Sequence, residues 1–464
     1  MTQQVTFLGR AQGLVGSDEG VAVDRVTRQL TKLRDLAFEE LTTSEELRDQ
    51  ARAIRLETLA HLDRHLSRFI DEAIAAGCRV HFAGDAAEAN RIVADVLRGS
   101  RVVAKSKSMV SEEIELNQHL ESLGMKVVET DLGEYISQLA GDTPSHIIAP
   151  VLHMTKEGVG ALFAEHLGVE YSDDPIRLNR YAREALRSVF LEADAGVTGV
   201  NLAVAETGSI VLVTNEGNGR LVSTAPRVHV ALMGMERIVP TWDQAAVILE
   251  TLARSATGQR LSVYTNVVTG PRRADDPDGP EEVHIVIIDN GRSDVLGGAT
   301  AEILACIRCG ACLNVCPVFR TVGGHAYGTV YSGPVGSVVS PGLHGGDPWW
   351  DLPYASTLCG ACEEVCPVRI QIPSMLLHLR EQAASEGRLP GWLNRGMRAY
   401  TASATDPSKW ARLKRTARWA TAPFSVRGWI RRLPGPARGW TQYRDLPRPP
   451  RQSFTDWWKS DRGS

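Results

Sequence analysis

The chain has 464 residues, of which 43% are hydrophobic and 23% charged, and its formal net charge is −4. This composition is ordinary for a globular protein and excludes disordered, collagen-like and membrane-spanning chains. The near-neutral charge gives the whole molecule no signature of nucleic-acid binding. The length predicts two to four domains of roughly 150 residues each. Seven of the eight cysteines fall between Cys306 and Cys366, whereas Cys78 stands alone and is expected to be a buried structural thiol.

The start of the chain, MTQQVTFLGR, lacks the basic region, apolar core and cleavage site of a secretory signal. No run of about 18 uncharged apolar residues occurs, so no transmembrane helix is expected. We therefore expect a cytoplasmic protein. Cysteines stay reduced in that compartment, and a cluster of them favours metal over disulfides.

Residues 1–78 are predicted to form an N-terminal helical segment with an apolar stripe at helical spacing: Leu59, Leu62, Leu66, Ile70 and Ile74. Residues 79–297 alternate short β-rich runs with helical stretches, which predicts an α/β domain on a largely parallel sheet. The closer spacing of the later strands predicts that part of the sheet is antiparallel or mixed. The expected strands are VHFAG, RVVAKS, KVVETD, HIIAP, GSIVLVTN, RVHVALMGM, SVYTNVV and EVHIVIIDN.

The loop after the second of these strands carries Lys105 and Lys107 at the start of a helix that Ser108 or Ser111 can cap. Such a pair of lysines could hold an anion, and a solvated loop is the competing interpretation. No GxGxxG after the first strand, Walker loop, HExxH or GxSxG is present. The catalytic residues, if the domain has any, are therefore unknown.

Residues 298–386 form a cysteine block. Its first run, CIRCGACLNVCP from 306 to 317, has the C-x2-C-x2-C-x3-C-P spacing of bacterial ferredoxins. Three thiolates on a tight loop can reach one cubane, while the fourth is turned away and ligates the other cluster. The second run, CGACEEVCP from 359 to 367, repeats the ending of the first with one cysteine fewer.

This crossed ligation assigns the seven thiols to two iron–sulfur clusters, most simply of the 4Fe–4S type. Cluster 1 takes Cys306, Cys309, Cys312 and Cys366. Cluster 2 takes Cys316, Cys359 and Cys362. The position that matches Cys306 is Ser356, so the fourth ligand of cluster 2 is open. A non-cysteine ligand such as Ser356, a 3Fe–4S cluster, or an open iron held by a partner or substrate would each fit. Zinc, which wants four ligands, fits this frame poorly.

Forty-two residues separate the two cysteine runs, too many for a compact bacterial ferredoxin hairpin, and helices are expected after each run, as over 372–385. This arrangement resembles the helical ferredoxins in electron-transferring subunits of the succinate dehydrogenase and heterodisulfide reductase type. Within the insert, His325, Tyr327 and Tyr331 are candidates for a surface where a redox partner docks. An ordered loop packed over the clusters is the alternative.

Residues 387–464 form a basic, Trp-rich C-terminal segment. From Gly391 onward there are sixteen Lys or Arg against four Asp or Glu, and seven of the ten tryptophans. This part carries +12, so the first 390 residues carry −16. The asymmetry predicts that the tail binds an acidic protein surface, and peripheral contact with a membrane is a second interpretation.

Several segments, in this order, resemble the lactate utilisation protein B family: AKSKSMVSEEIELN, VVETDLGEYI, PSHIIAPVLH, AVAETGSIVLVTNEGNGR and the paired runs CIRCGACLNVCP and LCGACEEVCP. The resemblance covers nearly the whole chain. It implies a LUD-type α/β domain over 79–297, similar to ribose-5-phosphate isomerase and CoA-transferase domains. It also implies a helical ferredoxin domain over 298–386 with two iron–sulfur clusters.

The function implied by the resemblance is electron transfer during oxidation of L-lactate to pyruvate, as a subunit of a multi-protein system rather than as a stand-alone enzyme. The implied partners are a cysteine-rich subunit resembling the catalytic subunit of heterodisulfide reductase and a second protein with a LUD domain. The alternative is that the α/β domain itself oxidises a 2-hydroxy acid and feeds the clusters.

Overall fold

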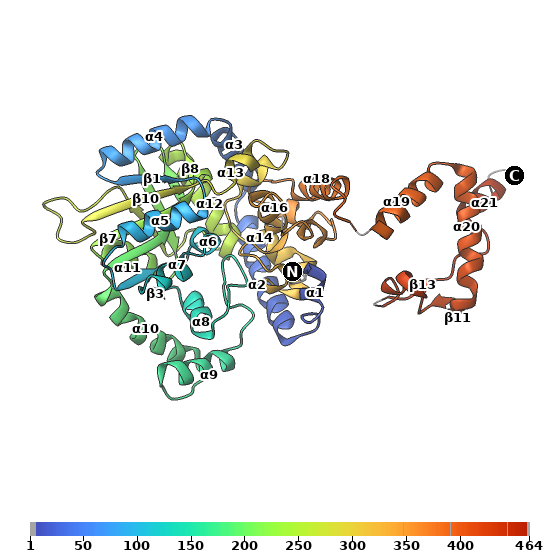
Figure 1. Cartoon of the computed structure of the whole chain (residues 1–464), viewed down its shortest axis with the longest axis horizontal. Helices are drawn as coiled ribbons and strands as arrows, with labels where there is room; N and C mark the ends of the chain where they lie inside the picture. Colours follow the sequence, from blue (N-terminus) through green and yellow to red (C-terminus); the bar gives the residue numbers. More distant parts are fainter. Residues whose placement is uncertain (1–5, 347, 390, 443, 462–464) are drawn as a thin grey trace. The chain divides into compact units, whose positions relative to one another are not determined.

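The computed structural model describes residues 6–346, 348–389, 391–442 and 444–461. The chain divides into two units, Met1–Gln382 and Ala383–Ser464, which are described separately. The predicted helical segment, the α/β domain and nearly all of the cysteine block lie in the first unit (Figure 1). Among the described residues, every helix is too short or too polar to span a bilayer.

The first unit is built on a six-stranded, wholly parallel sheet with strand order β1-β10-β7-β4-β2-β3. Its strands are β1 (Arg79–Ala83), β2 (Val102–Lys105), β3 (Lys126–Glu129), β4 (Ala195–Gly199), β7 (Val228–Gly234) and β10 (Glu282–Ile288). Both faces of β7 are buried, since Val230 and Leu232 join one hydrophobic core while Ala231 and Met233 join another. Burial on both faces explains why these strands are continuous apolar runs in the sequence.

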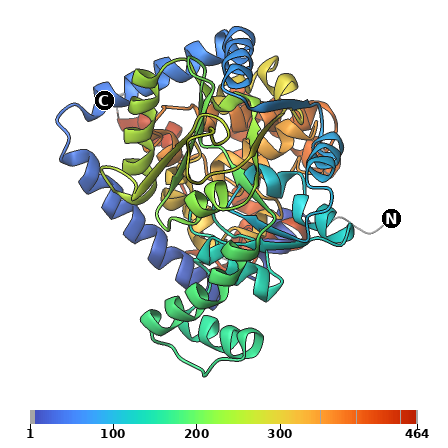
Figure 2. The same cartoon turned by 90° about the vertical axis from the view of Figure 1, so that its left-hand side faces the viewer.

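Helices pack against both faces of this sheet (Figures 1 and 2). One face is covered by α5 (Ala86–Val96), α6 (Met109–Glu113) and α7 (Leu116–Ser122), and the other by α4 (Leu62–Ala75). The apolar stripe predicted for the N-terminal segment is wrong at its end, because Ile74 is exposed. The buried face of α4 includes the predicted Leu62 and continues through Phe69 and Ala73.

A second, four-stranded sheet has the order β8-β5-β6-β9. Its strands are β5 (Leu202–Val204), β6 (Ser209–Thr214), β8 (Ile238–Val239) and β9 (Tyr264–Val268). The pairs β5–β6 and β6–β9 are antiparallel and β5–β8 is parallel. The expected mixed pairing therefore occurs, but in a second sheet rather than in part of the main one. The sequence did not predict β4, β5 or β8. The expected strand HIIAP is wrong: the His146 ring accepts the N–H groups of Ile148 and Ala149 and holds a turn there.

The cysteine block consists of short helices, which confirms its helical character. They are α14 (Ala311–Val315), α15 (Pro317–Val322), α16 (Gly333–Leu343), α17 (Ala361–Glu364) and α18 (Ile372–Ser385). They share one hydrophobic core with α2 (Asp18–Glu39), α3 (Ser44–Ala60) and α12 (Trp242–Thr257). The N-terminal helices therefore pack directly on the cysteine block, although 250 residues or more of sequence separate them.

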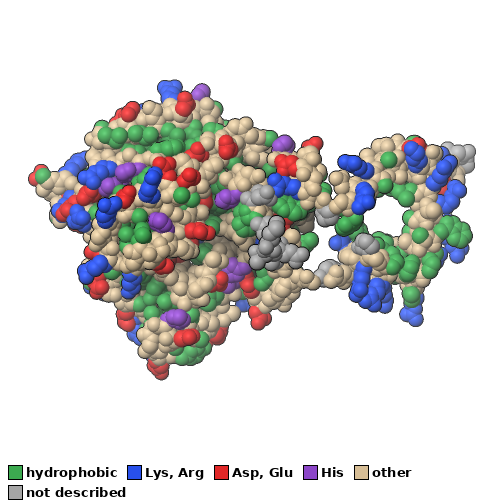
Figure 3. All heavy atoms as spheres, viewed as in Figure 1, with side chains coloured by type: hydrophobic (Ala, Val, Ile, Leu, Met, Phe, Trp, Pro, Cys, Tyr) green, Lys and Arg blue, Asp and Glu red, His purple; other side chains and the backbone are tan. Residues whose placement is uncertain are grey.

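The remaining helices of the first unit are α1 (Phe7–Ala11), α8 (Leu132–Ala140), α9 (Lys156–Leu167), α10 (Pro175–Glu192), α11 (Asn218–Thr224) and α13 (Arg292–Leu296). The second unit contains α19 (Gly391–Ala404), α20 (Pro407–Thr421), α21 (Phe454–Asp461) and a small antiparallel sheet of β11 (Ser425–Val426), β12 (Trp429–Ile430) and β13 (Leu446–Pro447). Lys and Arg side chains are spread over its surface (Figure 3), and large side chains such as Trp419 are exposed.

Candidate functional site

Four of the seven predicted ligands line one small cavity. Cys306, Cys309 and Cys312 come from the first loop, and Cys366 comes from the end of the second run. Burial, reinforced by the neighbouring thiolates, raises the pKa of Cys309 to about 12 and that of Cys366 to about 11. Buried thiols of this kind ionise only when a positive partner such as iron compensates the charge.

The other three predicted ligands also lie near one another. Burial and the charges of Cys316 and Cys359 raise the pKa of Cys362 to about 12. Burial raises the pKa of Cys316 as well, and Cys359 adds to that effect. Cys359 itself is exposed, and its pKa is lowered because the N–H of Ala361 donates a hydrogen bond to its sulfur. The structure thus brings together the two sets of thiols that the spacing predicts.

Ser356 takes the same place in the second loop as Cys306 in the first. The N–H of Leu358 donates to Ser356 Oγ at 3.1 Å, just as the N–H of Arg308 donates to Cys306 Sγ at 3.3 Å. Both loops build this turn from residues with positive φ: Arg308 (59°) and Gly310 (75°), Leu358 (55°) and Gly360 (85°). Non-Gly residues rarely adopt this conformation, so its recurrence marks a shared local design. Ser356 Oγ therefore holds the same position in its turn as Cys306 Sγ does in the first loop.

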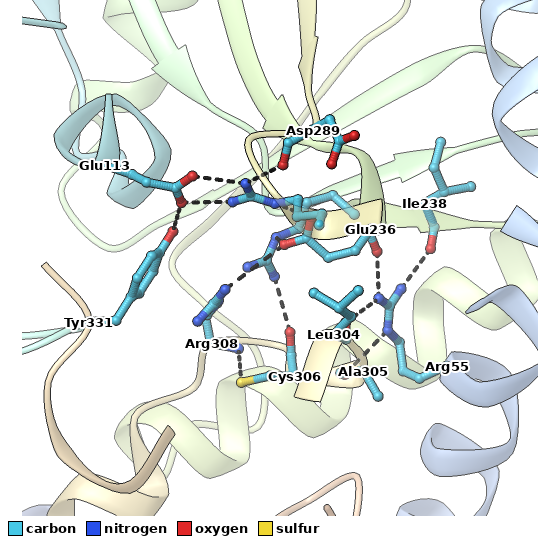
Figure 4. Close-up of polar contacts among 12 residues, drawn as sticks. Arg55, Glu113, Glu236, Ile238, Asp289, Leu304, Ala305, Cys306, Arg308 and Tyr331 are labelled. Carbon is cyan, nitrogen blue, oxygen red and sulfur yellow. Dashed lines mark hydrogen bonds and ion pairs between the residues drawn. The ribbon is translucent and has the colours of Figure 1, made fainter. Parts of the chain in front are cut away.

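A buried charge network links the first loop to the α/β domain (Figure 4). Glu236, in the turn after β7, accepts a hydrogen bond from Arg292 at 2.8 Å and lies 3.4 Å from Arg237 and 4.0 Å from Arg308. Burial alone would raise the pKa of Glu236, but these three arginines hold it at about 2. Arg292 also binds both carboxylate oxygens of Glu113, at 2.8 and 2.7 Å. The network is charged and almost fully buried, so its members depend on one another.

The backbone just before the first loop is clamped by two arginines. Arg55 of α3 donates to the carbonyls of Leu304 and Ala305 at 3.1 and 3.3 Å, and Arg237 donates to the carbonyl of Cys306 at 3.3 Å. Arg55 also bonds to the carbonyls of Glu236 and Ile238 (Figure 4). The loop is thereby held against the α/β domain from several directions.

The second run is held by other arginines of the N-terminal helices. Arg48 donates to the carbonyls of Glu364 and Cys366 at 2.5 and 3.0 Å, and Arg34 donates to that of Val365 at 2.9 Å. The sequence reasoning missed these arginines. The sequence did contain a signal for some of them: Arg48, Arg52 and Arg55 follow one another at intervals of four and three residues, which places them on one face of a helix.

The described part of the insert between the runs is folded into short helices and turns, and two of its three candidate docking residues are buried. Tyr327 and Tyr331 are 0% and 2% exposed, so the predicted role of these two residues in docking is wrong. The Tyr331 hydroxyl donates to Glu113 at 2.5 Å, and its ring lies 4.2 Å from the guanidinium of Arg308. His325 is held by an ion pair with Glu19 at 3.1 Å.

The residues present fit an iron–sulfur cluster. Four buried thiols converge on one cavity, and a cluster ligated by them would carry negative charge. Beside it lies Arg308, only 9% exposed, whose Nε and Nη1 find no hydrogen-bond partner within the described part of the chain. Buried guanidinium nitrogens without an acceptor are costly, and a thiolate-ligated cluster is one anionic group that could face them.

The α/β domain holds a second candidate site, a cavity of about 380 Å³. Lys107 lines it, and its buried Nζ has no partner among the described residues. Lys105 is also buried, but it is paired with Glu112 at 2.7 Å and Glu129 at 2.5 Å. The interpretation of this loop as solvated is therefore wrong. Ser108 caps α6 by accepting the N–H of Ser111 at 3.2 Å, as predicted.

Cys78 is buried and far from both sets of ligands in sequence, and burial raises its pKa to about 11. This confirms the expected buried thiol.

Comparison with known proteins places these sites in a family. Residues 66–288 match the LUD domain, and residues 302–370 match the 4Fe-4S dicluster domain. Lactate utilization protein B of Bacillus licheniformis is 48% identical over 448 residues, covering 95% of this chain and 93% of that protein. Its counterpart in Bacillus subtilis is 47% identical over 454 residues, covering 96% and 94%.

Among solved structures, a DUF162 family protein from Deinococcus radiodurans matches 49% of this chain and 98% of its own, with 16% identity and a TM-score of 0.28. The sequence relatives are far closer and extend over almost the full length of the chain. With a LUD domain followed by an iron–sulfur dicluster domain, the chain belongs to the lactate utilization protein B family.

Proposed function

We propose that this protein is a cytoplasmic electron-transfer subunit with two 4Fe–4S clusters that takes part in oxidation of L-lactate to pyruvate. The observation that carries the proposal is the convergence of seven thiols into one group of four and one group of three. The names of the relatives supply the link to lactate. When bound, such clusters accept and release one electron at a time.

In this proposal the first cluster is held by Cys306, Cys309, Cys312 and Cys366. The second is held by Cys316, Cys359 and Cys362, with Ser356 Oγ as its fourth ligand. The mirrored hydrogen bonds at Cys306 and Ser356 support this choice over a 3Fe–4S cluster. The arginine network holds the first loop in place and compensates the negative charge of the thiolates.

The ligand assignment is tested by iron and sulfide counts on protein purified without oxygen. Two 4Fe–4S clusters give about eight iron and eight sulfide per chain, and a 4Fe–4S with a 3Fe–4S cluster gives about seven iron. Low-temperature EPR of the oxidised protein separates the two cases, because an oxidised 3Fe–4S cluster is paramagnetic. A colourless protein after anaerobic reconstitution would contradict the proposal.

The link to lactate is tested by deleting the gene and measuring growth on L-lactate as sole carbon source. We expect growth to fail, and to return with the wild-type gene but not with a Cys309→Ala gene. Unimpaired growth of the deletion strain would contradict the role. If L-lactate alone reduced the clusters of the purified chain, the α/β domain would be the oxidising site and the relay proposal would give way to it.

We further propose that the basic C-terminal unit binds an acidic surface of a partner, either a cysteine-rich subunit or a second LUD-domain protein. Arg412, Arg415 and Trp419 on α20 are exposed and supply the charge and the aromatic surface. Reversing Arg412 and Arg415 to Glu should abolish co-purification with such partners. The same reversal at Arg183 and Arg187, which are exposed on α10, is the matched control.

A further inference from the structure

The cavity of about 380 Å³ opens at the carboxyl ends of three parallel strands. Residues 106–108 follow β2, Asp131 follows β3, and residues 199–201 end and follow β4. In open α/β sheets, ligands bind in the crevice outside these strand ends. The volume suits a small organic ligand.

One wall of this cavity belongs to the first cysteine loop. Ile307 and Arg308 line it, and the same two residues line the small cavity formed by the four thiols. Arg308 also donates its backbone N–H to Cys306 Sγ. A ligand in the α/β cavity and a cluster on the thiols would therefore have the Arg308 side chain as a common neighbour.

Cationic donors without partners lie at this cavity. The Nζ of Lys107 and the Nε and Nη1 of Arg308 are buried and have no hydrogen-bond partner within the residues that the structure describes. Arg237 lines the cavity too, but Glu236 already pairs with it. Buried donors that lack acceptors destabilise a fold, so an anion supplied from outside is their natural complement.

The surroundings of Lys107 limit the charge of that anion. Glu134, Asp131 and Glu216 act on Lys107 electrostatically without forming a hydrogen bond with it. Burial raises the pKa of Glu134 well above its usual value and that of Glu216 to about 7, so the repulsion of a doubly charged phosphate relative to a single carboxylate comes mainly from Asp131. The cavity also offers the side-chain NH2 groups of Asn201 and Asn218 to a hydroxyl or carbonyl group, since their amide oxygens already accept hydrogen bonds from Val213 and Thr214. Its remaining lining is partly apolar: Ile147, Ile148, Leu252, Ala253 and Ala256.

We propose that this cavity binds a short 2-hydroxy or 2-oxo monocarboxylate, with its carboxylate on Lys107 and Arg308, and that occupancy is coupled to the redox state of the neighbouring cluster. The proposal that the cavity binds this ligand depends only on the cavity. The proposal that binding is coupled to the cluster rests on the proposed electron-transfer function. A bound anion next to the cluster disfavours an added electron, so it lowers the reduction potential. By linkage, reduction weakens binding of the anion by the same factor.

Binding is tested by calorimetry on the anaerobic, cluster-loaded full chain with pyruvate, L-lactate and inorganic phosphate as probes. We expect pyruvate or lactate to bind and Lys107→Met to weaken that binding by about tenfold or more. Lys156→Met, at an exposed lysine of α9, is the matched control and should bind as the wild type does. Ala256→Leu, which fills the cavity without changing charge, should also weaken binding.

Three results would each overturn the proposed ligand class: no binding of either carboxylate, equal affinity in Lys107→Met and wild type, or tighter binding of phosphate than of the carboxylates.

The coupling between binding and the redox state of the cluster is tested by EPR-monitored redox titration with and without pyruvate. We expect a lower potential for one cluster in the wild type and no shift in Lys107→Met. Binding without a shift in the wild type would overturn the coupling. Binding that persists in Cys309→Ala would show that the cavity site stands even if the proposed relay fails.

Discussion

The two cysteine loops of the first unit build the same backbone turn in different surroundings. In the first loop Cys309 is buried, and Arg55 and Arg237 hold the preceding backbone against the α/β domain. In the second loop Cys359 is exposed, and a serine replaces the first cysteine. Local spacing thus sets the turn, while tertiary contacts set exposure. The first loop faces the interior and the α/β cavity, whereas Cys359 of the second loop is exposed.

The largest effect is expected from loss of a thiol in the buried loop. Cys309→Ala should lower the iron content by at least one and by up to about four iron per chain, because the three thiolates that remain in that group no longer complete a four-iron cube. Iron analysis with EPR measures the loss. Cys78→Ala, which removes the buried thiol of the α/β domain, should leave the iron content unchanged. Unchanged iron in Cys309→Ala would contradict the ligand assignment.

The charge network behind the first loop should matter more for stability than any exposed ion pair. Glu236→Gln leaves Arg292 and Arg237 without their shared carboxylate and should destabilise the protein by about 3 kcal/mol. Anaerobic denaturation in urea, followed by circular dichroism, measures this change. Glu170→Gln removes an exposed partner of Arg177 and should cost about 0.5 kcal/mol or less. Similar losses in the two variants would mean that the network does not hold the loop.

The two loops differ in one candidate ligand atom, Ser356 Oγ in place of Cys306 Sγ, and substitution of Ser356 tests whether that oxygen is a ligand. Ser356→Ala should convert the second cluster to a 3Fe–4S form, because no oxygen remains to hold the fourth iron, and EPR of the oxidised protein detects that form. Ser356→Cys should restore the thiolate pattern of the first loop and keep about eight iron per chain. An alanine variant with the iron content and spectrum of the wild type would show that Ser356 is not a ligand.

A smaller, pH-dependent effect is expected in the insert that joins the two loops. The ion pair with Glu19 raises the pKa of His325 to about 9, and the Thr143 carbonyl and Asp142 add to the effect. A raised histidine pKa stabilises the fold fully below its unfolded value of about 6.5, and this contribution is lost as pH rises through about 9. Wild type should therefore lose about 1 kcal/mol between pH 7 and pH 10, after allowance for partial exposure.

The comparison for this prediction is His325→Gln, which carries no titrating group at that position. Its stability should vary less over the same pH range, as measured by thermal melting in matched buffers. His153 packs edge-on against His325, and burial lowers the pKa of His153. His153 should therefore contribute little to the change in stability above pH 7. Parallel pH profiles for the variant and the wild type would contradict the assignment.

The cysteine spacing predicted the two thiol groups because ferredoxin ligation depends on a short loop whose geometry is local. The α/β character was predictable for a similar reason, since a doubly covered parallel sheet needs continuous apolar strands such as β7 and β10. The failures also have local causes. HIIAP has the composition of a strand, but the His146 ring accepts hydrogen bonds from backbone N–H groups that a strand would use to pair with its neighbour. The likeness of this domain to ribose-5-phosphate isomerase and CoA-transferase domains stays a prediction.

The sequence by itself determined the ligands offered for metal, the turn that presents them and the family to which the chain belongs. Only the tertiary structure decided which loop is buried, which arginines compensate its thiols and where the α/β cavity lies. The pairs Arg55 with Ala305 and Glu236 with Arg292 join residues 250 and 56 positions apart. Such contacts depend on how helices and sheets pack, and no local pattern of charge or spacing encodes them.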